Sequence, residues 1–246
     1  MSATSLLDCY LSGDRVAVWD EMIRLGPLIR REPSFSEALP VVREVVDRCH
    51  VNLKKLHGRL IDLGYAFAKP GSALVEAGPG AEDRIRAIED RLGTLPMLVR
   101  EWYQRFESVD FSQSWPQQIE TVASGVGGLG FNGTLIMQDL DACRAQSEES
   151  EPSSPEARTA FLPLGPYASN CEAMGFRLPD LGVDGIYYND GGGDTYFIQH
   201  LRETFAWGGF PFCAGFLNRH RLIRHLCAIP DVERILPILR EGMLPI

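Results

Sequence analysis

The chain has 246 residues with 45% hydrophobic content, enough to bury a large core as one large domain or two small ones. Its formal net charge of −9 argues against non-specific binding to nucleic acid, because neutralising phosphates needs clustered cations. No apolar run is long enough to span a membrane, and we expect no signal peptide. The six cysteines form no C-x-x-C pair, which favours reduced thiols in a cytoplasmic protein.

Helical periodicity dominates the first quarter of the chain. A first helix is predicted over residues 14–31, with a break near Gly26-Pro27. A longer helix follows at 42–63, where apolar residues recur in heptads: Val42, Cys49, Leu56 and Leu63, with Val46, Leu53 and Leu60 at the alternate positions. This pattern favours packing against the first helix within the chain, and a coiled-coil dimerisation element is the alternative.

Residues 69–80 are rich in proline and glycine and predict a connection between elements. We take it as the boundary between a helical N-terminal segment, 1–80, and an α+β domain, 81–246, with one continuous domain as the alternative. Two short helices are predicted next, at 82–92 and 96–107, because apolar residues in both recur at helical spacing.

Strand-like segments follow the two short helices. Strands are predicted at Gly133–Gln138 and Phe161–Leu164, with a single helical turn at Asp139–Ala145 after the first. A polar, acidic loop is predicted at 147–156, because this segment has no apolar residue to offset the entropy of ordering.

The stretch Asp194–Phe210 has the strongest pattern of predicted regular structure in the sequence. Strands at Gly185–Asn189 and Thr195–Ile198 flank an Asp-Gly-Gly-Gly turn and predict a hairpin. The second strand should run directly into a helix that ends at Gly208-Gly209. Two more helices are predicted near residues 216–228 and 231–242. Helices at both ends with strands between them favour the α+β class over alternating α/β.

Three candidate sites for catalysis or ligands are weak. The sequence of residues 125–130 matches G-x-G-x-x-G, but no helix opens after it, so we interpret it as a loop. Possible zinc ligands lie at Cys213, His220, His225 and Cys227, but the two histidines are five residues apart and point in different directions on a helix. We therefore predict no metal site and no cofactor. His200 could act as a base, although no partner for it can be named.

Four aspartates surround the predicted hairpin: Asp180, Asp184, Asp190 and Asp194. Their spacing does not match a calcium-binding loop. One interpretation is a solvated turn. The other is an acidic rim that recognises a basic protein partner.

Two phrases resemble the SUKH superfamily, which includes fungal regulators of cell-wall synthesis and bacterial immunity proteins that neutralise toxins. GTLPMLVREWYQRF at 93–106 is similar to its opening Leu-Pro helix. GGGDTYFIQHL at 191–201 is similar to its Gly-Asp turn, strand and following helix. The resemblance implies a mixed, mostly antiparallel sheet with helices packed on it. It also implies a protein-binding role without a shared catalytic residue set.

We therefore expect a non-enzymatic cytoplasmic protein-binding module, of the toxin-immunity type, whose oligomeric state is left open. The alternative from another class is a small hydrolase or transferase. Its site would lie in a cleft beside the 186–198 hairpin and would use His200 or a cysteine.

Overall fold

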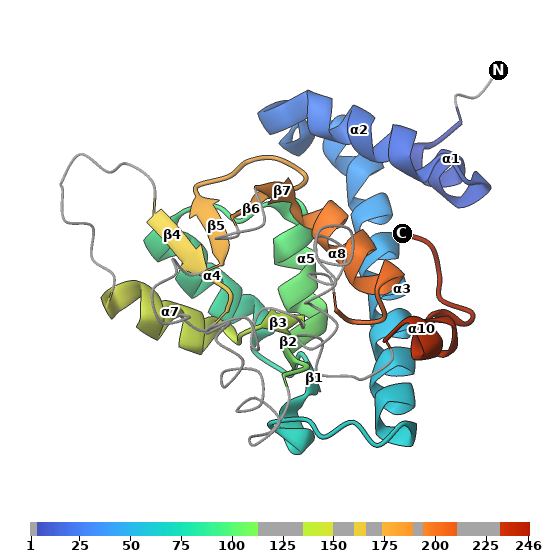
Figure 1. Ribbon diagram of the computed structural model, residues 1–246. Helices are drawn as coiled ribbons and strands as arrows, with labels where there is room; N and C mark the ends of the chain where they lie inside the picture. The colour runs from blue at the N-terminus through green and yellow to red at the C-terminus, as the bar shows by residue number, and fades with distance from the viewer. Residues whose placement is uncertain (1–3, 113–134, 150–159, 166–173, 189–193, 211–231) are drawn as a thin grey trace.

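The computed structural model describes residues 4–112, 135–149, 160–165, 174–188, 194–210 and 232–246 (Figure 1). It confirms the α+β class, with helices in the N-terminal part and packed against two antiparallel sheets. None of the helices in these ranges is long and apolar enough to cross a membrane. The predicted helix at 216–228 lies outside the described residues, as does the Asp-Gly-Gly-Gly turn at 190–193.

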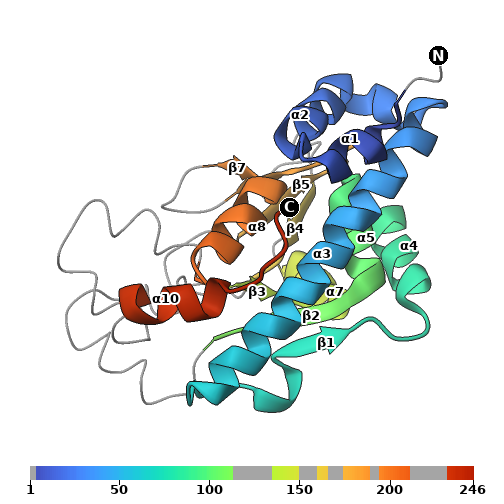
Figure 2. The same ribbon diagram turned by 90° about the vertical axis from the view of Figure 1, so that its right-hand side faces the viewer.

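The chain begins with two helices that lie across the start of a long third one (Figure 2). Helix α1 (Leu6–Ser12) is capped by Ser5, whose hydroxyl accepts from the Asp8 amide. Helix α2 (Arg15–Leu25) and the 3-10 helix η1 (Gly26–Arg30) confirm the predicted first helix and its break at Gly26, whose φ is +50°. Helix α3 (Ser34–Asp62) contains the whole predicted heptad helix except its last residue, Leu63.

The heptad stripe of α3 packs within the chain, as predicted. Its buried residues are Val42, Val46, Cys49, Leu53, Leu56 and Leu60. The main neighbour is helix α5 (Met97–Arg105) rather than the first helix, while α1 contacts another part of α3, and α10 (Val232–Arg240) also packs against it. Because these contacts cover the stripe, the coiled-coil alternative is wrong.

Strand β1 (Leu74–Glu76), strand β2 (Phe106–Asp110) and strand β3 (Ile136–Met137) form the first sheet in that order. Leu74 lies opposite Val109, and Val109 lies opposite Met137. Strand β1 was predicted as a connection, and Phe106 was predicted inside a helix. Both predictions were wrong because the cross-strand pairing of two distant segments overrides their local pattern. The segment 1–80 thus contributes a strand to a sheet shared with later residues.

The second sheet has the order β4-β5-β6-β7 and is antiparallel throughout its described strands: β4 (Ala160–Pro163), β5 (Gly175–Leu178), β6 (Ile186–Tyr188) and β7 (Thr195–Tyr196). The pairing of Ile186 with Tyr196 confirms the predicted hairpin. Helix α8 (Phe197–Ala206) follows β7 directly, and Gly208 and Gly209 end it with φ of +61° and +97°. The backbone amide of Gln138, next to β3, donates to the Leu164 carbonyl, next to β4, at 2.8 Å and so joins the two sheets.

The remaining helices cover the sheets. Helix α4 (Ala81–Leu92) confirms a predicted helix. Helix α7 (Leu140–Glu149) extends beyond the predicted turn, so the loop prediction for 147–156 is wrong at residues 147–149, and residues 150–156 lie outside the described ranges. The inner face of the second sheet meets α5 and α8 through an aromatic core. The ring of Phe197 lies 5.4 Å from that of Phe176 and 5.6 Å from that of Trp102, both edge-on. One core cluster runs from Tyr10 to Ile246.

Candidate functional site

The loop between β5 and β6, residues 179–185, holds two of the four aspartates predicted as an acidic rim. It also caps both helices of the aromatic core. The amides of Met97 and Leu98, at the start of α5, donate to the carbonyls of Gly182 and Val183 at 3.1 and 2.9 Å. The Asp180 carboxylate accepts from the Gly182 amide at 2.8 Å and so stabilises the turn itself.

Asp184 is buried, with only 5% of its surface exposed. Its Oδ2 atom accepts from the Trp19 indole at 3.0 Å and from the Ile198 amide at 3.1 Å. The carboxylate therefore caps the N-terminus of α8 and ties α2 to it. Burial raises the pKa of Asp184 from 3.8 to about 7, although these hydrogen bonds oppose the shift.

The three aspartates in the described part of the chain therefore do not form one surface. Asp194 is exposed and Asp180 is half-buried, whereas Asp184 faces the interior and Asp190 lies outside the described residues. The prediction of an acidic rim is wrong for Asp184. Its acidic neighbours in the sequence suggested solvent, but its hydrogen-bond partner Trp19 lies 165 residues away.

His200 is buried in α8 and is not placed to act on a substrate. Its ring centroid lies 4.5 Å from that of Tyr187 on the inner face of the sheet. Burial lowers the pKa of His200 to about 4, so the imidazole is neutral at physiological pH. A base that is both covered and weak gives no support to the hydrolase or transferase alternative.

Two of the three described cysteines are covered and cannot act as nucleophiles, and the third, Cys9 on α1, is partly buried. Cys49 and Cys143 are buried, and burial raises the pKa of both thiols, that of Cys143 to about 12. Within the described ranges, no group of three or more His, Cys, Asp or Glu side chains could hold a metal ion. The G-x-G-x-x-G segment at 125–130 and the cysteines and histidines at 213–227 lie outside these ranges, so our interpretations of them stay predictions.

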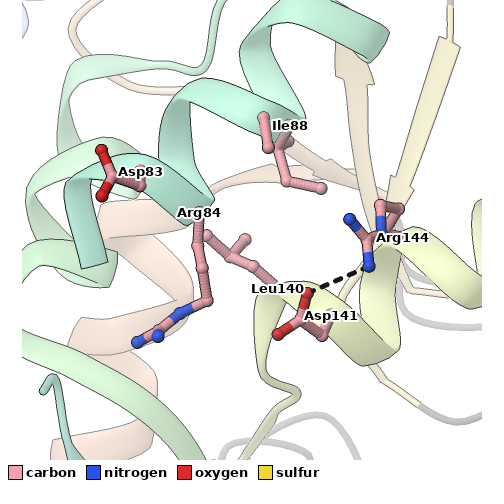
Figure 3. Close-up of a pocket in the computed structure, with 7 residues that line it drawn as sticks. Asp83, Arg84, Ile88, Leu140, Asp141 and Arg144 are labelled. Atoms are coloured by element: carbon pink, nitrogen blue, oxygen red, sulfur yellow. Dashed lines mark ion pairs between the residues drawn. The ribbon is translucent and has the colours of Figure 1, made fainter. Parts of the chain in front are cut away.

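A shallow pocket of about 190 Å³ lies between α4 and α7. Figure 3 shows Ile88 and Leu140 between the two helices and the ion pair of Arg144 with Asp141 on α7, at 3.3 Å. Arg84, which also lines the pocket, pairs with Glu107 at 3.2 Å. Both arginines thus already have a carboxylate partner, and the lining residues include no nucleophile. The pocket offers an apolar floor with a polar rim, and no chemistry of its own.

The outer face of the second sheet is the strongest candidate for a binding site. Phe176 lies opposite Tyr187 and both point into the core, so the adjacent Arg177 and Ile186 point outward. Register then brings Phe161 beside Arg177 and Tyr196 beside Ile186. We call this row, together with Tyr188, the outer sheet face: Phe161, Arg177, Ile186, Tyr188 and Tyr196.

This face is apolar and aromatic although it is partly open to solvent. Ile186 and Tyr196 expose 41% and 40% of their surface. The guanidinium carbon of Arg177 lies 4.5 Å from the centroid of the Tyr188 ring, a cation–π contact that fixes both side chains. Tyrosine, other aromatic residues and arginine are the types enriched at the centres of protein–protein interfaces.

The sequence located only part of the outer sheet face. The hairpin prediction placed Ile186 and Tyr196 on paired strands, but β5 was missed and Arg177 with it. The alternation in Gly175–Leu178, where Phe176 and Leu178 point inward and Arg177 outward, is the signal that could have identified the strand. Comparison with family models, with curated proteins and with solved structures gives no match.

Proposed function

We propose that this chain is a non-enzymatic module that binds another protein through the outer sheet face. The observation that carries the proposal is a row of aromatic and aliphatic side chains around one arginine, exposed on a sheet whose other face packs on α5 and α8. Binding can remove apolar area of this surface from contact with water, and the sheet already orders its side chains.

The chemistry of the other described groups agrees with a binding role. His200, Cys49 and Cys143 are buried. Burial lowers the pKa of the imidazole and raises the pKa of the two thiols, so each group stays uncharged. The resemblance to the SUKH superfamily makes a toxin the expected partner, with this chain as its immunity protein. The net charge of −9 and the exposed Asp194 at the start of β7 favour a partner with a basic rim.

Binding to candidate toxins, including the products of neighbouring genes, tests the proposal. Ile186→Asp places a charge in the centre of the outer sheet face and should weaken the affinity at least about tenfold, as expected for a residue in an interface centre. Ile61→Asp on α3 is the matched control, because Ile61 exposes 54% of its surface and lies on a different element. It should leave the affinity unchanged.

Two results would contradict the proposal. One is equal loss of affinity in both variants, which would indicate a general effect of charge or stability. The other is a bound partner whose affinity neither Ile186→Asp nor Tyr196→Ala changes, which would place the interface elsewhere on the chain. Circular dichroism of each variant checks that the fold is retained.

A further inference from the structure

Two guanidinium groups lie over the buried ring of Tyr10 and the charge of a third acts on its hydroxyl, so that α1, α2, α3 and α8 contribute one residue each. The guanidinium carbons of Arg15 and Arg48 lie 5.8 and 5.4 Å from the ring centroid. The charge of Arg202 also acts on the Tyr10 hydroxyl, together with those of the other two arginines. We call this group the Tyr10–arginine cluster: Tyr10, Arg15, Arg48 and Arg202.

Three hydrogen-bond donors of the cluster are covered and unpaired. The Tyr10 hydroxyl, Arg15 Nε and Arg202 Nη2 are inaccessible to solvent and have no hydrogen-bond partner among the described residues. Tyr10 itself is completely buried. Buried polar atoms are nearly always satisfied by protein, water or a bound ion, so an unpaired set on neighbouring residues indicates a guest.

Most acceptors around the cluster are already in use. The Glu44 carboxylate accepts from Arg48 Nε at 2.7 Å, and the Pro245 carbonyl accepts from Arg48 Nη1 at 2.9 Å. The Ile246 oxygen accepts from Arg202 Nε at 3.1 Å. Asp184 and Asp20 also act on Arg202. The Asp184 Oδ2 accepts from Trp19 and from a backbone amide, while its Oδ1 is buried and has no partner among the described residues. The cluster thus has three unpaired donors against this one unpaired buried acceptor, and donors are in excess.

From this imbalance we infer that the Tyr10–arginine cluster binds a small oxyanion, of the carboxylate or phosphate type. Guanidinium groups donate through a planar fork that matches the oxygens of such anions, and a phenolic hydroxyl adds one more donor. An oxyanion offers several lone pairs on adjacent oxygens and can meet donors from different helices, whereas one water offers two. The anion would then hold α1 and α2 on α3 and α8.

Thermal unfolding of the full chain in acetate, sulfate and phosphate tests the inference, each against sodium chloride at equal ionic strength. We expect a saturable rise in Tm of about 5 °C with at least one oxyanion. Sulfate and phosphate also stabilise proteins without binding, through exclusion from the surface. The decisive quantity is therefore the difference between the wild type and variants of the cluster.

Tyr10→Phe removes only the unpaired hydroxyl and keeps the ring, so the fold should persist. Arg202→Lys keeps the charge and loses the fork. Each should weaken the anion's apparent Kd at least about tenfold. Arg43→Gln is the matched control, because Arg43 lies on α3 outside the cluster, pairs with Glu101 and exposes 62% of its side chain; its Kd should equal that of the wild type.

The inference fails if oxyanions raise Tm no more than sodium chloride does, or if Tyr10→Phe and Arg202→Lys respond to anions as the wild type does. Water would then be the acceptor in the cluster. The result is independent of the proposed function, because none of these residues belongs to the outer sheet face and Ile186→Asp should leave anion binding unchanged.

Discussion

The free energy of unfolding of Asp184→Asn minus that of the wild type should be larger at high pH than at low pH. The native carboxylate is buried, and its pKa rises from 3.8 to about 7. The folded state therefore holds the proton more tightly than the unfolded state. Between these two values, raising the pH removes stability, because folding must bury a carboxylate that is charged in the unfolded chain. Above about pH 7 the penalty is constant.

The magnitude follows from the shift. One pKa unit corresponds to about 1.4 kcal/mol, so the full penalty is about 4 kcal/mol and the part that develops between pH 5 and pH 8 is about 2.5 kcal/mol. Asparagine keeps an oxygen acceptor for the Trp19 indole and the Ile198 amide but never ionises. The stability of Asp184→Asn minus that of the wild type should thus increase by this amount over the interval.

Urea denaturation at pH 5, 6, 7 and 8 measures this difference, and titratable groups common to both proteins cancel in it. Asp194→Asn is the control, since Asp194 is exposed in a neighbouring segment, and its difference should stay within about 0.5 kcal/mol at every pH. If Asp184→Asn instead loses stability as the pH rises, the charged carboxylate is stabilised by its donors more than burial opposes it. The reasoning from burial would then be refuted.

Asn52→Ala removes two hydrogen bonds between the buried Asn52 amide and the backbone of Leu244, at 2.7 and 2.8 Å. We expect a loss of about 2 kcal/mol in urea denaturation, with faster proteolysis of the C-terminal segment; proteolysis at the wild-type rate would contradict this. Gly175→Ala should cost more than about 3 kcal/mol, because its Cβ would lie 2.0 Å from the Leu162 carbonyl oxygen. By contrast, Gly58→Ala, on an open face of α3, should gain up to about 1 kcal/mol, and a similar loss in both variants would show that the clash is not the cause.

Elements with a strong local pattern were predictable. The helices α2, α3 and α4 follow from apolar spacing that persists over several turns, and the β6–β7 hairpin follows from two β-rich runs around a glycine-rich turn. The transition from β7 to α8 was also predictable, since both elements and the glycines that end the helix lie within one short stretch.

The strands β1, β2 and β5 were not predicted, because three to five residues carry little periodic signal. Strand β1 pairs with a segment more than thirty residues away, and nothing near Leu74 in the sequence indicates Val109 as its neighbour. Phe106 fits the helical stripe of Trp102, yet the available partner strand makes it extended. For the same reason Arg177, the arginine of the outer sheet face, was missed.

By itself, the sequence determined where the helices α2 and α4 and most of α3 lie, where the hairpin lies and that the class is α+β, because backbone preference and apolar spacing act over neighbouring residues. Helix α1 was not predicted. Only the tertiary structure decided which polar groups are buried. It turned Asp184 from an expected surface acid into the cap of α8, and it brought Tyr10 and Arg202 together from opposite ends of the chain. Burial depends on which element covers which, and that is a property of the packed fold rather than of any local stretch.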